Sequence, residues 1–379
     1  MSDLVTPPRA EVRIDLGAYR RNITMLRGRL VGGAQLWAVV KANAYGHDVD
    51  HVAQEAVAAG ARRLCVATLS EARHLRQGGL RVPVLIMGPL DEPSIRRALD
   101  LDVSVTVLSD AMAAAVERIA VDGTRRGRPA RIHLKVDTGM GRWGVPLGGA
   151  LDQLERLDAL PGVEVEGLMT HFATADEPDT SFFELQLERF TDLAEAARVR
   201  VPGLTIHAAN SAATLLDERA HFDAVRCGVA TFGMNPTQRD AAEFGLEPVL
   251  ELRSHVADIR ELQPGESTGY GRSFIATEPV RVAEVPIGYA DGVHRALAGV
   301  GEALVHGARC RMVGNVSMDH VSLLVDADVA IGDVVTLLGR DGDASISTEE
   351  HARWMDTINY EVTCGLAGEP RLLRVHVSS

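Results

Sequence analysis

The chain has 379 residues, of which 46% are hydrophobic and 24% charged, a composition typical of a globular protein and unlike that of a disordered or fibrous one. Lysine and arginine together number 39 and aspartate and glutamate 52, so the formal net charge is −13. Such an acidic chain is poorly suited to neutralising phosphates, and we expect no nucleic-acid partner. The length suits one α/β barrel of about 200 to 250 residues followed by a smaller domain.

The four cysteines are scattered and form no CxxC pair, which argues against a disulfide scaffold and against a zinc site. The N-terminus has no apolar signal segment, and no apolar run approaches the roughly 20 residues of a membrane-spanning helix. We therefore expect a cytoplasmic protein with reduced thiols, without a metal and without a membrane partner.

The first 240 residues alternate short β-branched runs with longer segments of helical period. Helical segments such as Val49–Ala59, Ser70–Gln77, Ser109–Val121 and Thr180–Arg198 separate the runs, with Ser70 and Glu71 as a helix start. This alternation builds a parallel sheet with helices outside, and eight such units close into a (β/α)8 TIM-type barrel over residues 1–240. The eight predicted strands are Gln35–Val40, Arg63–Ala67, Pro83–Met87, Val103–Val107, Ala130–Val136, Val163–Met169, Leu204–His207 and Ala224–Arg226.

From about residue 241 to residue 379, strands follow one another closely with glycine turns between them, which predicts a mainly antiparallel β domain. One helix is expected at Thr348–Met355, where Ser347 and Glu350 form a capping box. The predicted strands are Val249–Ile259, Val280–Pro286, Ala303–His306, Arg309–Val313, His320–Asp326 and Asp333–Leu338.

Catalytic groups of a barrel gather at the carboxyl ends of its strands, where the loops converge. The predicted strand ends carry an unusual number of polar groups: Lys41, Lys135, His171, the segment His207–Ser211, and Arg226. Lys41 follows a buried strand, and a desolvated lysine has a lowered pKa and can form a Schiff base. Taken alone, Lys41 fits equally well a surface lysine whose stem lies along apolar groups. His133 and His207 have no metal-ligand spacing and are interpreted as structural histidines.

Nine motifs occur in order along nearly the whole chain, and together they resemble the alanine racemases. The first is a decapeptide around Lys41 that resembles the pyridoxal-phosphate lysine motif of that family. The motifs are Ala38-Val-Val-Lys-Ala-Asn-Ala-Tyr-Gly-His47, Lys135-Val-Asp-Thr-Gly-Met-Gly-Arg142, Thr170-His-Phe-Ala173, Ala209-Asn-Ser-Ala212, Arg226-Cys-Gly-Val229, Gly269-Tyr-Gly271, Pro286-Ile-Gly-Tyr-Ala-Asp-Gly292, Ser317-Met-Asp319 and Asn359-Tyr-Glu361.

The resemblance implies a pyridoxal 5'-phosphate enzyme with two catalytic bases, Lys41 and Tyr270. Lys41 would hold the cofactor and serve one face of the substrate α-carbon, while Tyr270 of the partner subunit would serve the opposite face. Each site would therefore be shared across a homodimer. His171 would hydrogen-bond the tyrosine and lower its pKa.

Arg226 would face the pyridine nitrogen of the cofactor, where a guanidinium can only donate and keeps that nitrogen unprotonated. The resulting weak electron sink favours racemisation over side reactions. Asn210 and Ser211 also predict the start of a helix over Ala212–Asp217, close to where barrels bind phosphate. The full set of cofactor-binding residues that the resemblance implies is Lys41, Tyr45, His171, Asn210, Ser211, Arg226, Gly228, Val229 and Tyr360.

Arg142 and the partner's Met318 would bind the substrate carboxylate, and Lys135 stands where the family often has a carbamylated lysine that orients this arginine. The residues alone allow Lys135 to be an ordinary lysine paired with Asp137 or another carboxylate. Cys227, Phe232, Asp48, Trp143 and Asn315 depart from the usual pattern without removing a catalytic group. Four residues would line the substrate entrance: Asp176, Tyr289, Arg295 and Asp319.

We therefore expect an amino-acid racemase, an isomerase that interconverts L- and D-alanine and supplies D-alanine for peptidoglycan. A racemase of serine or of broader specificity stays open within the same class. A barrel-type pyridoxal-phosphate decarboxylase of basic amino acids is the second class of enzyme, although its usual C-terminal Cys and acidic motif is not seen. A non-catalytic cofactor-binding barrel is a third alternative, and such proteins generally lack the β domain.

Overall fold

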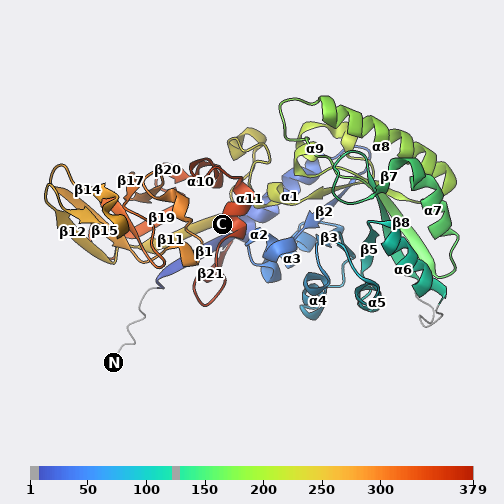
Figure 1. Ribbon diagram of the computed structural model, residues 1–379, viewed down its shortest axis with the longest axis horizontal. Coiled ribbons are helices and arrows are strands. Elements are labelled where there is room, and N and C mark those ends of the chain that lie inside the picture. Colours follow the sequence, from blue (N-terminus) through green and yellow to red (C-terminus); the bar gives the residue numbers. More distant parts are fainter. Residues whose placement is uncertain (1–7, 122–128, 379) are drawn as a thin grey trace. The chain divides into compact units, whose positions relative to one another are not determined.

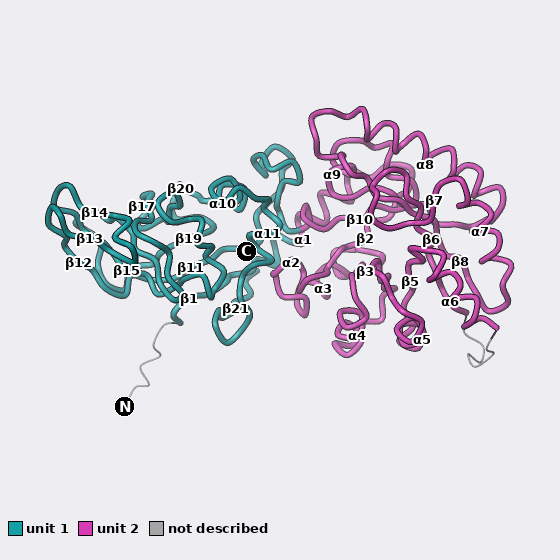
Figure 2. The backbone as a smooth tube through the Cα atoms, viewed as in Figure 1, with its two compact units in different colours: residues 1–19, 232–379 teal, residues 20–231 magenta. Residues whose placement is uncertain are grey.

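The computed structural model describes residues 8–121 and 129–378. Contacts between Cα atoms divide the chain into two compact units, which Figure 2 colours separately. One unit, here called the barrel unit, is Arg20–Thr231, and the other, here called the β unit, combines Met1–Tyr19 with Phe232–Ser379. Each unit is described by itself.

Eight parallel strands form the barrel unit, which confirms the predicted fold class. They are hydrogen-bonded in the order β5-β4-β3-β2-β10-β9-β8-β6, and pairing of β5 with β6 closes the barrel. A short strand β7, Val145–Pro146, extends the pairing of β6. The strands are β2 (Gln35–Val39), β3 (Arg63–Val66), β4 (Val84–Ile86), β5 (Ser104–Val107), β6 (Ala130–Asp137), β8 (Val163–Met169), β9 (Thr205–His207) and β10 (Ala224–Cys227).

Helices flank the strands on the outside of the barrel (Figure 1), each burying an apolar face. Helix α5, which the sequence analysis did not predict, buries Ile95, Ala98 and Leu99 at the i, i+3, i+4 spacing of an amphipathic helix. The helices are α1 (Leu16–Gly28), α2 (Lys41–Tyr45), α3 (Val49–Ala58), α4 (Leu69–Gln77), α5 (Glu92–Asp100), α6 (Asp110–Val121), α7 (Ala150–Asp158), α8 (Ser181–Arg200) and α9 (Ser211–Leu216).

The predicted start of α4 at Ser70 is wrong by one residue, because the helix begins at Leu69. Thr68 is the N-cap. Its hydroxyl accepts the Glu71 N–H at 3.2 Å, and the Glu71 carboxylate accepts the Thr68 N–H at 3.0 Å. Ser70 lies inside the helix and contacts the Thr68 hydroxyl at 3.0 Å. Glu71 was expected at the start, and it occupies the third position of a capping box.

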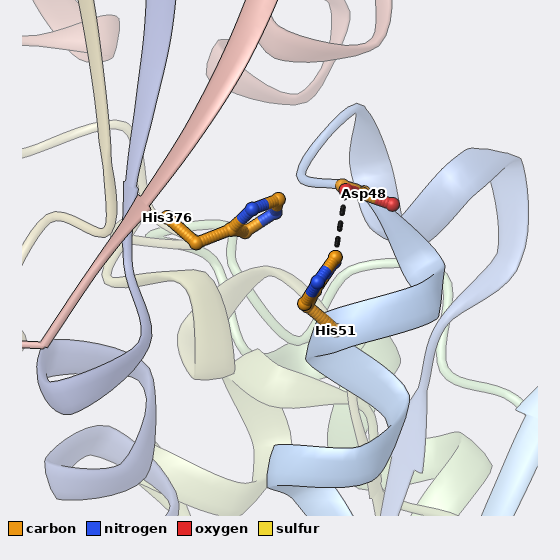
Figure 3. A group of neighbouring side chains, drawn as sticks. All are labelled: Asp48, His51 and His376. Atoms are coloured by element: carbon orange, nitrogen blue, oxygen red, sulfur yellow. Dashed lines mark hydrogen bonds and ion pairs between the residues drawn. The ribbon is translucent and has the colours of Figure 1, made fainter.

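Asp48 explains one departure from the family pattern. Its φ of 65° lies in the left-handed region that favours glycine, yet its side chain accepts the Asp50 N–H as the N-cap of α3. The same carboxylate contacts His51 Nδ1 at 3.2 Å, as the dashed line in Figure 3 shows. The cap and this contact offset the strain that a glycine would avoid.

The β unit contains a sheet whose strand order is β12-β15-β18-β17-β16-β19-β11-β1-β21, with β20 paired to β19. All of its pairs are antiparallel except β1 with β21. Its strands are β1 (Ala10–Asp15), β11 (Leu250–His255), β12 (Asp258–Leu262), β15 (Val280–Val285), β16 (Glu302–Val305), β17 (Ala308–Val313), β18 (Val321–Val325), β19 (Val334–Asp341), β20 (Ala344–Ile346) and β21 (Leu373–Val377).

Smaller elements complete the β unit. Strands β13 (Ser267–Thr268) and β14 (Phe274–Ile275) form a separate hairpin, and α11 (Asn359–Cys364) follows α10 (Thr348–Met355). Helix α10 has the predicted bounds and the predicted capping box of Ser347 and Glu350.

The division of the chain differs from the expected barrel over residues 1–240. Strand β1 pairs with β11 and β21, so the N-terminal segment belongs with the C-terminal residues and not with the barrel. The chain enters the barrel unit within α1 and leaves it at Thr231. Among the described residues, no helix is both long enough and apolar enough to span a membrane.

Candidate active site

Lys41 follows β2 after a single residue, Val40, and begins a turn with unusual backbone geometry. The next three residues, Ala42 to Ala44, have φ of 53°, 52° and 53°, which is a left-handed helical turn that costs roughly 1–2 kcal/mol per residue. Surrounding bonds hold the turn: the Ala42 N–H donates to Glu71 Oε1 at 2.7 Å, and Asn43 Oδ1 accepts the Val49 N–H at 2.9 Å. Strain of this kind persists where the surroundings fix the backbone, and it concentrates at functional sites.

Tyr45, Ser211 and Gly228 lie together beside Lys41. The Lys41 ammonium is 6.0 Å from the centre of the Tyr45 ring. A Cβ added to Gly228 would lie 2.4 Å from the Tyr45 hydroxyl, so only glycine allows this approach. Ser211 Oγ accepts the N–H groups of Gly228 at 3.1 Å and Ala230 at 3.3 Å, which leaves its own hydroxyl hydrogen to donate.

The predicted N-cap at Asn210 is present at the start of α9. Asn210 Oδ1 accepts the Ala213 N–H at 3.0 Å, and the helix begins at Ser211. Val229 begins a 3-10 helix that runs to Phe232. The loops after β9 and β10 therefore present their backbone and one buried hydroxyl on the same side of the barrel as Tyr45.

Arg226 is only 3% exposed and is held by four contacts of its two Nη atoms. Nη1 donates to His207 Nδ1 at 2.8 Å, and Nη2 donates to the carbonyls of Thr170 and Ala208, each at 2.8 Å. Nη2 also lies 3.2 Å from His171 Nδ1. Within the described residues, no carboxylate pairs with Arg226 and its Nε–H makes no hydrogen bond, so that donor remains for a ligand. Burial lowers the pKa of Arg226 to about 10.

A chain of hydrogen bonds leads from Arg226 across the barrel interior. Because a guanidinium only donates, His207 Nδ1 must accept, so His207 carries its proton on Nε2 and donates to His133 Nδ1 at 3.0 Å. His133 then carries its proton on Nε2 and donates to Glu166 Oε2 at 3.1 Å. Arg63 Nη1 lies 2.7 Å from the same His133 nitrogen, but it has Glu166 Oε2 as an alternative acceptor at 2.9 Å. The opposite order would set two donors against each other at the fully buried His207.

Glu166 is the anion at the end of this chain. Burial alone would raise the pKa of its carboxyl, but the bond from His133 and the charge of Arg63 hold it well below the usual range. The Ser104 hydroxyl adds a third bond, at 2.6 Å. Burial lowers the pKa of His133 to about 4, so this imidazole is neutral near pH 7. The Trp37 ring packs against Arg63, with its centre 4.6 Å from the guanidinium carbon.

Lys135 and Arg142 add positive charge near Arg226 and His171. Burial, and after it the charges of Arg226 and Arg142, lower the pKa of Lys135 to about 8. The open alternative of an ion pair with Asp137 is not observed within the described part of the chain, since that carboxylate accepts the N–H groups of two turn glycines. Burial and the neighbouring cations likewise hold the pKa of His171 well below its ordinary value.

Tyr270 lies in the β unit and is 77% exposed. It starts a 3-10 turn between Gly269 and Gly271, both with φ of 73°, a conformation that glycine adopts without strain. The Asn315 side chain donates to the Tyr270 carbonyl at 2.7 Å. Asn315, one of the departures from the family pattern, therefore supports the backbone of the expected second base.

The remaining predicted residues are exposed or partly exposed. Tyr289 and Met318 in the β unit are 44% and 53% exposed. Asp319 accepts a bond from Arg371 at 2.6 Å, and Asp176, in the barrel unit, has a raised pKa because its carboxyl is partly desolvated. Arg295 begins a 3-10 helix, and Tyr360 lies in α11.

Comparison with known families covers nearly the whole chain. The sequence model described as the N-terminal domain of alanine racemase matches residues 14–236, and the one described as the C-terminal domain matches residues 249–376. The chain belongs to the alanine racemase family. The resemblance found in the motifs is thereby confirmed, and with it the assignment to the isomerases. The alternative classes of enzyme are not favoured.

Alanine racemases of several bacteria show the same extent of similarity. The chain is 42% identical to that of Citrifermentans bemidjiense over 374 residues, covering 97% of this chain and 98% of the relative, and 41% identical to that of Symbiobacterium thermophilum, covering 96% of each. The crystal structure of alanine racemase from E. faecalis matches with a TM-score of 0.90 and 36% identity over 98% of both chains. The structure from Bacillus anthracis with bound L-Ala-P matches with a TM-score of 0.87 and 37% identity, covering 99% and 96% of the chains.

The structure brings together most of the barrel residues that the motifs indicate, and it adds two that they did not. Lys41, Tyr45, Ser211 and Gly228 form one group, and Lys135, Arg142, His171 and Arg226 form a cationic one. Glu166 and Arg63 were not predicted. His133 and His207, which were interpreted as structural, join Glu166 to Arg226. Two histidine side chains inside a barrel were the signal that could have indicated a buried acidic partner.

Proposed function

We propose that this member of the family interconverts L-alanine and D-alanine with pyridoxal 5'-phosphate as cofactor, in a homodimer whose subunits share each site. One observation carries the proposal above the others. A lysine just after β2 lies in the same barrel as a buried arginine that has a remaining donor and, among the described residues, no carboxylate partner. Most other reactions of the cofactor need an acidic group that protonates the pyridine nitrogen. Arg226 can only donate a hydrogen bond, so that nitrogen stays unprotonated.

The residues of the barrel unit fit this cofactor. Arg226 Nε–H can donate to an unprotonated ring nitrogen, and the Ser211 hydroxyl can donate to a phosphate oxygen. The close approach of Gly228 to Tyr45 leaves no side chain between the tyrosine hydroxyl and the loop after β10. Asn210 and Val229 complete the proposed set in the barrel unit, whereas Tyr360, which the resemblance also implies, lies in the β unit. When bound, pyridoxal phosphate withdraws electrons from the substrate and makes its α-proton acidic.

Two bases of this chain then act on opposite faces of the α-carbon. The Lys41 amine removes or returns the proton on one face, and Tyr270 of the partner subunit does so on the other. The 77% exposure of Tyr270 in a single chain supports its use in a shared site. A base on each face inverts the centre without moving the substrate.

His171 is set up to help the tyrosine. Its Nδ1 faces Arg226, which can only donate, so the neutral ring carries its proton on Nε2. An Nε2–H that donates to the phenolic oxygen stabilises the phenolate and lowers the tyrosine pKa. We propose this bond between His171 and Tyr270 of the partner subunit.

The substrate carboxylate is proposed to bind Arg142 and the backbone of the partner's Met318. The pKa of about 8 supports carbamylation of Lys135, because the neutral amine is the form that adds CO2 and releases a proton. The carbamate would give Arg142 the anionic partner that the described residues do not provide. Asp176, Tyr289, Arg295 and Asp319 are proposed to line the entrance.

The test is isotope exchange in deuterated water. Purified protein loaded with pyridoxal phosphate should exchange the α-proton of L-alanine while optical rotation falls to zero, with serine and lysine as comparison substrates. Lys41→Ala should abolish the absorption of the bound cofactor. Tyr270→Phe should keep that absorption and lose exchange in one direction. Release of CO2, or binding without exchange, would refute the racemase assignment.

The product would be D-alanine, which we propose serves peptidoglycan synthesis in the cytoplasm. A strain that needs external D-alanine should grow without it when it expresses the wild-type chain. Expression of Lys41→Ala is the matched control and should not restore growth.

A further inference from the structure

Asp291 is the one acidic residue of the Pro286–Gly292 motif, and the proposed reaction does not use it. Its side chain is completely buried in the β unit. Burial alone would raise the pKa of its carboxyl, but bonds from Arg9, the Gly288 N–H and Arg371 hold it below the ordinary value. A buried charge costs free energy unless it is paired, and here two arginines and one backbone N–H pair with it.

Two arginines from opposite ends of the chain clamp this carboxylate. Arg9 binds both oxygens through its two Nη atoms, and Arg371 Nε donates to Oδ1 at 2.9 Å. Arg9 lies just before β1 and Arg371 just before β21, the pair of parallel strands that joins the two termini. Arg9 also donates to the carbonyl of Pro286 at 2.8 Å. We call these three side chains, Arg9, Asp291 and Arg371, the Asp291 clamp.

The clamp fixes the turn that carries Tyr289. Asp291 Oδ2 accepts the Gly288 N–H at 2.9 Å, which closes the turn from inside, and the Ala367 N–H donates to the Asp291 carbonyl at 3.1 Å. The clamp therefore holds the backbone of this turn at Pro286 and Gly288, and the Ala367 N–H holds it at Asp291. Tyr289 projects from this turn with 44% exposure.

The turn that carries Tyr289 is hydrogen-bonded to the turn that carries Met318. The Tyr289 N–H donates to the Ser317 carbonyl at 2.9 Å, and the Ala290 N–H donates to the Met318 carbonyl at 3.0 Å. At Gly288 the two backbones touch, since an added Cβ would lie 2.4 Å from the Ser317 oxygen and 2.5 Å from the Met318 oxygen. The two turns thus form one rigid piece of backbone within the β unit.

We infer that Asp291 is a positioning residue, and that the Asp291 clamp sets the backbone of Met318 and the side chain of Tyr289 for a substrate bound at the partner's site. The inference rests on the proposed function, in which Met318 meets the substrate carboxylate. It predicts that loss of the clamp weakens substrate binding and leaves the cofactor in place, because the hydrogen-bond partners of its three side chains, among the described residues, all lie in the β unit.

The decisive variant is Arg9→Gln, which removes one arm of the clamp and leaves the contact between Arg371 and Asp319 intact. We expect the KM for L-alanine to rise about tenfold, the loss of one charge-assisted bond, with kcat changed by less than about threefold. Asp291→Asn should act in the same direction and more strongly. The absorption of bound cofactor should equal that of the wild-type holoenzyme.

Arg309→Gln is the matched control. Arg309 also bridges two carboxylates of the β unit, Glu302 and Glu350, and its side chain is 39% exposed against 33% for Arg9. It touches neither turn, so its KM should match that of the wild-type protein. An equal rise of KM in Arg309→Gln would show that any loss of β-unit stability suffices, and would overturn the inference.

A second readout does not depend on turnover. Amide hydrogen exchange followed by mass spectrometry should show faster exchange at Tyr289 and Ala290 in Arg9→Gln than in Arg309→Gln. Unchanged exchange together with an unchanged KM would refute the positioning role. If the wild-type holoenzyme fails to exchange the α-proton of alanine, the proposed function fails, whereas the amide exchange still tests the clamp separately.

Discussion

Replacing Glu166 by glutamine should destabilise the barrel unit because it removes the anion that balances a buried cation. The carboxylate accepts from the Ser104 hydroxyl at 2.6 Å, Arg63 at 2.9 Å and His133 at 3.1 Å. The side chains of Glu166 and Arg63 are only 15% and 13% exposed, so water replaces little of what is lost. Breaking a buried pair on one side costs about 3–5 kcal/mol, and the residual exposure favours the lower end, about 3 kcal/mol.

Thermal unfolding measures this loss. For a domain of this size, about 3 kcal/mol corresponds to a melting temperature lower by roughly 6–12 °C. Glu164→Gln is the matched control, since Glu164 lies on the same strand β8, is exposed, and should change the melting temperature by no more than about 1 °C.

The same variant tests the direction of the hydrogen-bond chain. In the wild-type protein, ¹⁵N NMR should find His133 and His207 both neutral with the proton on Nε2. If the Glu166→Gln protein melts with the Glu164→Gln control, or if His207 carries its proton on Nδ1, the account of Glu166 as the anchor of this chain is wrong.

Three further changes follow from particular contacts. Burial lowers the pKa of His133 and of His351 to about 4, so between pH 6.5 and about 4 only the unfolded chain binds protons at these two residues. The free energy of unfolding should therefore fall as the pH drops through that window, by up to about 3 kcal/mol per histidine. Urea titrations at pH 7 and pH 4.5 measure this loss. Gly228→Ala should fold normally by circular dichroism but lose cofactor affinity in an absorbance titration, because the new methyl group would lie 2.4 Å from the Tyr45 hydroxyl. Thr68→Ala should cost about 1 kcal/mol in chemical denaturation by removing the cap of α4, and a loss near zero would contradict the cap's contribution.

The barrel was predictable because most of its strands are buried on both faces and appear in the sequence as short, mainly apolar runs between helical segments. The bounds of β8 are those predicted, and those of the other seven strands differ by one residue at one end, or at both ends for β4. Strand β1 was not predictable in the same way. Its burial alternates residue by residue, and its partners β11 and β21 lie more than 200 residues away, so tertiary contacts decide its place.

The residues of the site likewise divide into those that could be identified from the sequence and those that could not. Lys41 and Arg226 could be identified from the sequence because each ends a buried strand with a charge. Glu166 could not, since Val163-Glu-Val-Glu166 looks like a strand with one solvent face, and only the pairing of His133 with Gly167 places Glu166 near the first histidine. A Cβ on Gly167 would lie 2.4 Å from His133 Nδ1, so the packing of the chain depends on a glycine whose role appears only in three dimensions.

The hydrogen-bond chain also explains how Arg226, which contacts no carboxylate in the described part of the chain, can stay charged inside a barrel. The guanidinium of Arg226 is ionised near pH 7, since burial lowers its pKa only to about 10. Two neutral imidazoles link it to Glu166, and their N–H bonds all point toward that carboxylate. Each donor in such a chain is polarised by the next, so charge is stabilised without a carboxylate occupying the arginine. A direct ion pair would compete for the guanidinium, whereas this arrangement fixes both Nη atoms and keeps the Nε–H for the ring nitrogen of a cofactor.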